Sequence, residues 1–248
     1  MKLRVICLSV FSVVLVALII LVFGLTGVIS AGEPEISEEL QGVDPTDMSL
    51  YYAMGEYYPP NEVDSLNIDW KGGRVEIIAY NGDDYFVEEA ATRYLMENER
   101  LDYSLDGTQF SVYHTAAGAD EITDAYKKVE IRIPRKTAQA LKSLNINTDG
   151  EVVLKNITAE SIKINGRDQG VVFKNTYSPS SVITTNDGGV HLFVDNTIGY
   201  SVDFSSKEGR LDSYVDNGMD SYVSGDGKYA FKVKTKKGDL DVSLYEEE

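Results

Sequence analysis

A short phrase recurs along the second half of this chain, and its spacing constrains the fold more than any other feature. Each copy begins with a serine, continues with an apolar stretch and is followed by a polar turn that contains glycine. The copies start at Ser143, Ser161, Ser181 and Ser201, which are 18, 20 and 20 residues apart. Self-similarity at a period of about 20 residues or more is typical of stacked architectures, in which each unit contacts mainly its neighbours.

A second alternating stretch follows the glycine turn in the first three copies and is weak in the fourth. The phrase also occurs earlier, as Ser65-Leu-Asn-Ile, and near the end, as Ala230-Phe-Lys-Val. We therefore expect an all-β, single-domain, solenoid-like stack of short strands over residues 63–245. It should start at Ser65 and be closed by residues 230–244, and residues 246–248 should form an acidic tail.

Other signals join the strands between Ser65 and Ser143. Asn81-Gly82 is a tight-turn dipeptide, so it predicts a hairpin that leads into a strand over residues 85–91. Residues 88–101 contain good helix formers without a clean apolar stripe, and a short helix is an alternative there. A second hairpin is expected around Asp106-Gly107, and Pro134 should end a strand because it cannot donate to a ladder.

The N-terminus carries a membrane signal. Residues 5–29 are apolar and uncharged, and Lys2 and Arg4 precede them. As a helix this run spans about 37 Å, more than a hydrocarbon core of about 30 Å. We expect a transmembrane signal-anchor helix and a single-pass protein of the cell membrane, with residues 1–4 in the cytoplasm and the rest outside. The alternative is a cleaved signal peptide, since residues 28–31 also fit a cleavage site.

The stretch 30–62 is expected to be an extended linker, because it contains acidic residues and prolines but no basic residue. Four tyrosines near its end are unusual for a linker. They either dock on the edge of the following domain or contact a sugar or a protein partner. These residues are Tyr51, Tyr52, Tyr57 and Tyr58.

Composition excludes several classes of function. The chain has 40 acidic and 23 basic residues and a formal net charge of −17. Nucleic-acid binding requires a basic patch, so nucleic acid is not an expected partner. The only cysteine, Cys7, lies in the apolar run, so neither disulfides nor cysteine-bound metal can stabilise the exported part. Burial of apolar side chains must hold that part together.

Catalytic chemistry has little support in the residues. His114 and His191 lack the further ligands of a zinc site, and no nucleophile signature accompanies them. The best glycine-serine pair, in residues 224–227, is expected to be a turn. A polysaccharide-active enzyme would gather carboxylates on one face of the stack. The predicted outward positions are mostly uncharged: Asn145, Asn147, Lys163, Asn165, Ile183, Thr185 and Asp203. We therefore assign no catalytic, cofactor-binding or metal residues.

Calcium is a further alternative, because the acidic glycine turns at 186–188, 216–218 and 225–227 contain oxygen ligands. None has the spacing of an EF-hand or of the nonapeptide calcium repeat, and ordinary turn chemistry explains their residues. We expect no cofactor. Asn156-Ile-Thr158 matches an N-glycosylation acceptor, which would matter only in a eukaryotic secretory pathway.

The ordered set of phrases resembles the bacterial "putative adhesin" β-strand-repeat family, a domain of unknown function. The resemblance rests on residues 127–134, which end in Ile-Pro, on 144–154 with its Asp-Gly turn, and on 157–164. It extends over roughly residues 64–244, although relatives often have Ser-Gly-Asp at the turns. It implies a solenoid-like domain, often behind a membrane anchor in Gram-positive bacteria and linked to envelope sensing or surface interaction. It provides no catalytic residues.

Together these features predict a non-enzymatic, membrane-anchored extracytoplasmic module with an adhesin-like, interaction or envelope-stress accessory role. Its expected partners are the membrane, through the N-terminal helix, and an envelope component or membrane protein. Two alternatives stay open. One is a polysaccharide-active enzyme on a β-solenoid, and the other is a structural spacer at the cell surface.

Overall fold

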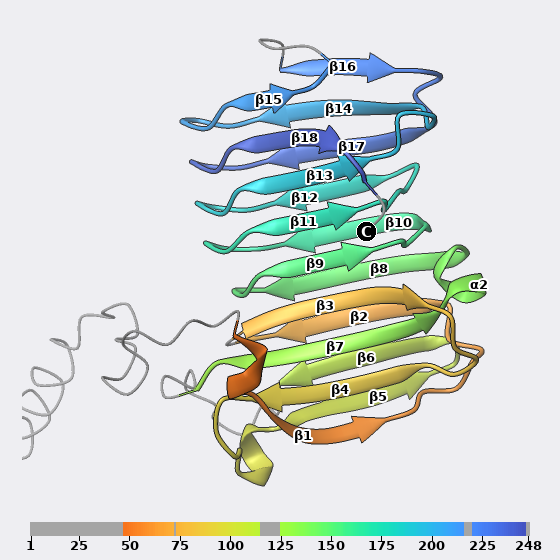
Figure 1. The fold of residues 1–248 in the computed structure, drawn as a ribbon, viewed down its shortest axis with the longest axis vertical. Helices are drawn as coiled ribbons and strands as arrows, with labels where there is room; N and C mark the ends of the chain where they lie inside the picture. Colours follow the sequence, from red (N-terminus) through yellow and green to blue (C-terminus); the bar gives the residue numbers. More distant parts are fainter. Residues whose placement is uncertain (1–46, 72, 115–124, 216–219, 247–248) are drawn as a thin grey trace, which may run out of the picture. The chain divides into compact units, whose positions relative to one another are not determined.

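Two β-sheets of nine strands each face one another in the computed structural model, which describes residues 47–71, 73–114, 125–215 and 220–246 (Figure 1). All of these residues belong to one compact unit, Glu39–Glu248. The predicted all-β fold is confirmed. The predicted helix at 5–29 lies outside the described residues, and no helix within them is long and apolar enough to span a membrane.

Short strands make up both sheets, and most neighbouring strands are parallel. Sheet A contains, in spatial order, β1 (Tyr52–Tyr57), β4 (Phe86–Ala91), β7 (Lys127–Pro134), β3 (Gly73–Tyr80), β9 (Val152–Lys155), β11 (Val171–Lys174), β13 (Val190–Val194), β18 (Leu240–Leu244) and β15 (Leu211–Ser213). Sheet B contains β16 (Ser221–Ser224), β14 (Tyr200–Ser205), β17 (Tyr229–Lys234), β12 (Ser181–Thr184), β10 (Ala159–Asn165), β8 (Leu141–Thr148), β2 (Ser65–Trp70), β6 (Gln109–His114) and β5 (Leu101–Asp106).

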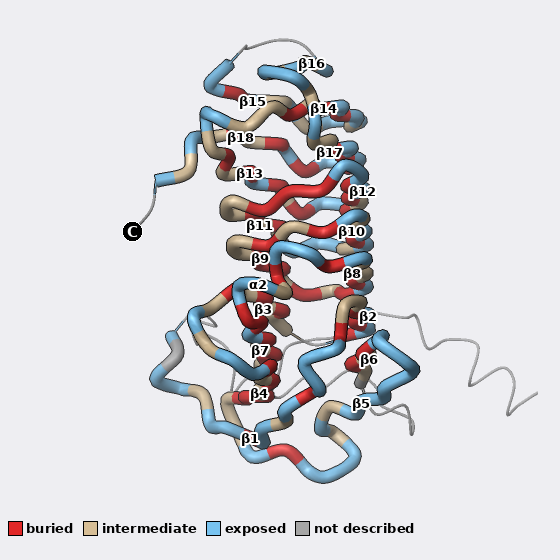
Figure 2. The backbone as a smooth tube through the Cα atoms, turned by 90° about the vertical axis from the view of Figure 1, so that its right-hand side faces the viewer, coloured by how far each residue is buried: buried red, intermediate tan, exposed pale blue. Residues whose placement is uncertain are grey.

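From β6 to β15 the chain alternates between the sheets, and each strand of sheet B forms one coil of the stack with the strand of sheet A that follows it; β2–β3 and β17–β18 form coils in the same way. Alternate residues point into the space between the sheets, as the period-2 pattern requires. Ile146 and Ile164 are paired across β8 and β10 and are 1% and 0% exposed. One apolar cluster runs through the coils and joins both sheets, for example where the rings of Phe173 and Phe231 lie 6.1 Å apart. Figure 2 shows these buried positions along the strands.

In the coils whose turns the structure describes, glycine-containing turns connect sheet B to sheet A, as at Gly188 and Gly238. The buried Thr185 Oγ1 donates to the Gly188 carbonyl at 2.7 Å, and Thr235 makes the equivalent bond to Gly238. The coils approach so closely here that a Cβ on Gly188 would lie 1.9 Å from the Gln169 carbonyl oxygen. Glycine is therefore required at this position by the spacing between coils, because any larger residue would push them apart.

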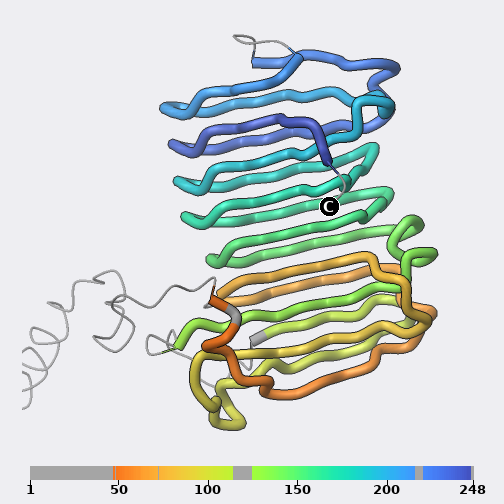
Figure 3. Tube along the Cα trace, in the orientation of Figure 1, coloured from red at the N-terminus to blue at the C-terminus, as the bar shows by residue number. Residues whose placement is uncertain are grey.

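The order of the coils differs from the order in the chain, so the predicted first and last coils are wrong. The β2–β3 coil lies between the β6–β7 and β8–β9 coils. The last coil, β17–β18, is inserted between β12–β13 and β14–β15 (Figure 3). The ends of the stack are instead formed by β1 and β5 on one side and by β15 and β16 on the other.

The repeat beginning at Ser181 is displaced by one residue from the predicted register. Ser181 pairs with Ile162, so Ser181, Ile183 and Thr185 point inward and are buried. The prediction that Ile183 and Thr185 point outward is wrong. Lys155 and Lys174 are paired at the ends of β9 and β11, and the connection from each to the next serine is six residues long, to Ser161 and to Ser180. Ser180, not Ser181, is therefore the structural equivalent of Ser161.

The hairpin predicted at Asn81-Gly82 is also wrong, because β3 and β4 do not pair. Both bind β7, which lies between them and matches β3 in parallel over eight residues, Gly73 to Tyr80. This pairing comes from distant sequence, and a local turn signal does not report it. The hairpin around Asp106-Gly107 is confirmed as antiparallel β5 and β6, and β7 ends at Pro134, where the one-turn helix α2 (Arg135–Ala138) follows.

The segment before β2 contributes a strand to the domain. Residues 52–57, within the stretch predicted to be linker, form the edge strand β1, which pairs antiparallel with β4. The ring of Tyr57 stacks on that of Tyr103 with centroids 3.8 Å apart. After β4 the ambiguous region contains only the 3-10 turn η3 (Glu97–Glu99), and another 3-10 turn, η2 (Met48–Leu50), precedes β1.

Candidate functional site

On the outer face of sheet B, the outward positions of β8 and β10 carry mostly uncharged polar side chains. Asn147, Lys163, Asn165 and Asp203 are exposed there, and Asn145 is half-buried. The Asn147 side-chain amide donates to Asp69 Oδ1 at 2.9 Å across neighbouring strands. This face presents hydroxyl, amide and lysine side chains, which suit binding through hydrogen bonds and charge.

The outer face of sheet A carries a connected row of ion pairs near β7. Lys128 Nζ lies 2.9 Å from Glu76 Oε2 and 2.7 Å from Glu130 Oε2, and Arg132 contacts the other oxygen of Glu130. Burial acts to raise the pKa of Glu130, but hydrogen bonds and charge from Lys128 and Arg132 outweigh it and hold the pKa below its usual value. A carboxylate held ionised in this way is poorly suited to donate a proton to a leaving group.

A second charged cluster lies inside the stack, near the end formed by β1 and β5, and involves β4 and β7. Lys127 Nζ is 2.9 Å from Glu89 Oε1, and both side chains are almost fully buried. The same ammonium donates to the Glu99 carbonyl at 2.7 Å and lies 4.4 Å from the centre of the Trp70 ring. Glu89 Oε2 accepts from the Leu101 amide at 2.9 Å.

Burial lowers the pKa of Lys127, and the charge of Glu89 partly opposes the shift. Every oxygen and ammonium group of this cluster has a partner in the fold, so we interpret it as structural. The prediction from sequence missed it. A signal was present, since Lys127 lies on the inward side of the alternation Val129, Ile131 and Ile133.

The two histidines do not form a site. His191 is exposed on the outer face of sheet A, as predicted from its position between Val190 and Leu192. His114 ends β6 in sheet B. Within residues 47–246, excluding the gaps at 72, 115–124 and 216–219, no three His, Cys, Asp or Glu side chains gather in a way that could hold a metal ion.

The turns considered for calcium use their oxygen atoms within the protein. Asp187 pairs with Lys237 at 3.1 Å, and the Asn186 carbonyl accepts from the Lys236 and Lys237 amides. Asp226 Oδ1 accepts from the Lys228 amide, so residues 225–227 form the turn that the sequence predicted. Residues 216–218 lie outside the described part of the chain. Calcium binding therefore gains no geometric support from the two described turns.

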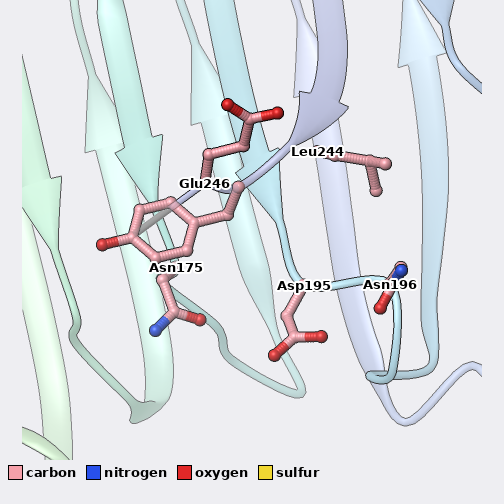
Figure 4. Close-up of a pocket in the computed structure, with 6 residues that line it drawn as sticks. Asn175, Asp195, Asn196, Leu244 and Glu246 are labelled. Atoms are coloured by element: carbon pink, nitrogen blue, oxygen red, sulfur yellow. The ribbon is translucent and has the colours of Figure 1, made fainter. Parts of the chain in front are cut away.

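A shallow hollow of about 310 Å³ lies where coils β10–β11 and β12–β13 turn back towards sheet B (Figure 4). Its lining includes Asn175, Asp195 and Glu246, but the two carboxylates point in opposite directions. Asp195 Oδ1 accepts from the amide and hydroxyl of Thr197 at 2.8 and 2.7 Å, and these bonds lower the pKa of Asp195. The hollow is a polar depression between turns, without convergent catalytic groups.

Large apolar side chains gather at the β1 end of the stack. Tyr94 and Met96, in the segment after β4, are 72% and 70% exposed. Tyr52 of β1 stacks against Tyr94, with ring centroids 5.2 Å apart, and is itself half exposed. We call Tyr52, Tyr94 and Met96 the aromatic end. Of the tyrosines noted in the sequence, Tyr57 docks within the domain, whereas Tyr52 and Tyr58 remain exposed.

Comparison with known proteins finds similarity at the level of the fold. The chain matches no protein-family model and no curated protein sequence. Its structure is similar to the crystal structure of a putative cell adhesion protein from Clostridium sporogenes, with a TM-score of 0.52 and 14% identity over 78% of this chain and 100% of that chain. At this identity the similarity concerns the fold.

Two further solved structures match more distantly. A putative adhesin from Bacteroides fragilis has a TM-score of 0.36 and 9% identity over 81% of this chain and 100% of that chain. One from Parabacteroides distasonis has a TM-score of 0.29 and 10% identity over 77% and 96%.

Proposed function

We propose that this chain is a non-enzymatic interaction module, adhesin-like in architecture, that acts outside the cytoplasmic membrane. The apolar run 5–29 would anchor it, and the two-sheet β-domain would be presented to the envelope. An accessory role in an envelope-stress response is part of the proposal. The similarity in fold to a putative cell adhesion protein supports the adhesin-like part.

The aromatic end is the observation that carries the proposal. Tyr52, Tyr94 and Met96 expose large apolar side chains, although the same domain buries a continuous apolar core. Contiguous exposed apolar groups commonly mark interaction sites, and tyrosine gives contact area at low conformational entropy cost. The ion-paired carboxylates of sheet A, by contrast, are already neutralised by their neighbours.

The position of the domain relative to the membrane can be tested with single cysteines, because Cys7 is the only native one. Val223 is 66% exposed and Ser181 is 2% exposed. A membrane-impermeant maleimide should label V223C in intact cells and leave S181C unlabelled until the protein is denatured. Labelling of V223C only after lysis would contradict an extracytoplasmic domain.

The interaction itself can be tested with a photo-crosslinking amino acid at Tyr94. We expect a discrete adduct with an envelope component in intact cells. The matched control places the same amino acid at Tyr113, a half-buried position on β6, where the adduct should be absent. No adduct at Tyr94, together with an unchanged envelope-stress response after deletion of the gene, would overturn the proposal and favour the spacer alternative. Turnover of wall or capsule glycans by the purified protein would favour the enzyme alternative.

A further inference from the structure

The most basic stretch of this acidic chain lies on one strand in the interior of sheet B. Residues 228–238 contain five lysines and no acidic residue, in a chain of net charge −17. They include β17, which lies between β12 and β14 (Figure 1). Phe231 and Val233 point into the core, so the lysines on alternate positions point outward. All five are exposed, and we call them the lysine row: Lys228, Lys232, Lys234, Lys236 and Lys237.

Part of this positive charge is not compensated within the fold. Lys237 pairs with Asp187 at 3.1 Å, and Lys232 makes a loose contact of 3.8 Å with Asp203, with both side chains more than 60% exposed. In the described part of the chain, neither Lys234 nor Lys236 has a carboxylate within 4.0 Å. A local surplus of positive charge therefore persists on a protein that is acidic elsewhere.

The surroundings of the row leave it accessible. The outward residues of the flanking strands are short, with Val182 and Thr184 on β12 and Ser201, Asp203 and Ser205 on β14. The lysine side chains extend beyond these shorter neighbours, and the hydroxyl groups of Thr184, Ser201 and Ser205 can add hydrogen bonds to a bound anion. Outward positions along a strand repeat every two residues, or about 6.6 Å, so the charges form a line along the strand.

We propose that the lysine row binds a linear anionic polymer that carries phosphate or carboxylate groups along its length. This names the partner chemistry of the interaction module proposed above, and it rests on that function. A line of repeated charges suits an extended polyanion, because successive anionic groups can pair with successive lysines. Asp203 and Asp187 offset Lys232 and Lys237 locally, whereas acidic residues farther away oppose binding only weakly, since charges more than about 8 Å apart are largely screened at physiological ionic strength.

An anionic membrane surface fits the row less well. Peripheral binding to lipid combines basic residues with apolar side chains that enter the interface. On the outer face of β12, β14 and β17 the exposed large apolar side chain is Val182, at 39%. A single half-exposed valine gives little insertion energy, so the polymer is favoured.

The test uses the full chain in nanodiscs of neutral phosphatidylcholine and two labelled probes, polyphosphate and polygalacturonate, with neutral dextran and phosphatidylglycerol vesicles as comparisons. We expect saturable binding of at least one polyanion, weakened by added salt, and none of dextran. The variant K234Q/K236Q should bind about tenfold more weakly, at a factor of about 2–5 per exposed charge. Preference for one probe identifies phosphate or carboxylate as the recognised group.

The control variant K155Q/K174Q removes the same charge from the outer face of sheet A, where Lys155 and Lys174 are paired neighbours. It should change the affinity less than twofold, with the same melting temperature as K234Q/K236Q. Equal losses in both variants, no polyanion binding, or binding to vesicles alone would overturn the inference. If that happened while the Tyr94 crosslink persisted in cells, the interaction function would stand without the lysine row. Absence of the crosslink would instead contradict the proposed interaction function itself.

Discussion

Ser181 places a hydroxyl group in the apolar interior of the stack. Its strand neighbours at the same depth are Ile162 and Phe231, and Ser181 Oγ has no hydrogen-bond partner among the described residues. Ser178, three residues earlier, is equally buried, but its Oγ donates to the Glu160 carbonyl at 3.1 Å and accepts from the Ser180 amide. A buried polar group is costly only when its hydrogen bonds are missing.

The same substitution should therefore have opposite effects at these two serines. S181A should stabilise the domain by about 1 kcal/mol, because it removes an unsatisfied hydroxyl, and S178A should destabilise it by about 1 kcal/mol. Urea unfolding followed by circular dichroism would measure both changes. A loss of stability in S181A comparable to that in S178A would show that the Ser181 hydroxyl has a partner.

Glu99 should make the stability of the β1 end depend on pH in the acid range. Hydrogen bonds from Arg93 to both carboxylate oxygens, at 2.9 and 2.8 Å, lower the pKa of Glu99 from 4.5 to about 2. A carboxyl group with a depressed folded pKa stabilises the fold above its unfolded pKa, and the contribution is lost as pH falls. The free energy of unfolding should therefore decrease between pH 4.5 and about 2.

The variant E99Q removes this titration and should flatten the dependence in that window, measured by urea unfolding at several pH values. E97Q provides the matched control, since Glu97 is an exposed residue of the same 3-10 turn. It should keep the slope of the parent protein. Identical slopes in the parent and in E99Q would rule out Glu99 as the source.

At the turns between the sheets, the close spacing of the coils restricts which residues fit. A Cβ at Gly188 would lie 1.9 Å from a backbone oxygen of the adjacent coil, whereas a Cβ at Gly170 would meet nothing closer than 3.5 Å. G188A should cost about 1–3 kcal/mol, the usual cost of overpacking. G170A should be close to neutral. Thermal unfolding would separate them, because 1 kcal/mol corresponds to about 2–4 °C in a domain of this size.

Because the last coil is inserted between two others, the C-terminal strands β17 and β18 join β12 and β13 to β14 and β15. β14 pairs with β17, and β15 pairs with β18, so neither strand contacts the β12–β13 coil directly in the sheet order. A chain that ends at Gly227 should leave Tyr200–Ser213 without these partners. We expect hydrogen exchange of the backbone amides in that segment to accelerate strongly, while β8 to β11 stay protected.

A chain that ends at Glu246 is the control for this truncation, because it keeps both β17 and β18. Its exchange pattern should match that of the full chain. Continued protection of β14 in the shorter chain would mean that β14 can dock on β12 in place of β17. The coils would then be interchangeable, as in a simple repeat array.

At the scale of the whole molecule, the strands and their inward residues were largely predictable from the sequence, because alternation reports burial locally. Leu144, Ile146, Ile162 and Ile164 all point inward as expected. The order of the coils was not predictable. It depends on which distant strand binds each edge, and β3 and β12 find their partners far from their neighbours in the chain.

The candidate surfaces were predictable only in part, for the same reason. The aromatic end combines Tyr52 with Tyr94, residues that the sequence analysis placed in a linker and in an ambiguous segment. The lysine row is visible in the sequence, but its exposure on an interior strand follows from the insertion of β17. The one-residue shift at Ser181 reversed inward and outward positions, since a slip by one residue turns every side chain to the other face.

Net charge acts on the whole stack, so salt should change its stability. At −17 the protein repels itself, and this repulsion weakens as the Debye length falls from about 30 Å at 0.01 M to about 8 Å at 0.15 M salt. The close ion pairs around Lys128 are largely buried and should be screened less. The melting temperature should therefore rise by several degrees between these two salt concentrations.

The variant K234Q/K236Q tests the origin of that rise, because it removes two positive charges and changes the net charge from −17 to −19. Its melting temperature should be lower than that of the parent at 0.01 M salt and should approach it at 0.15 M, since screening removes the added repulsion. The opposite charge change, D102N/D106N on the exposed edge strand β5, gives −15 and should reduce the salt response. A melting temperature that falls with salt in all three proteins would show that attractive ion pairs, and not net repulsion, dominate the electrostatic energy of the fold.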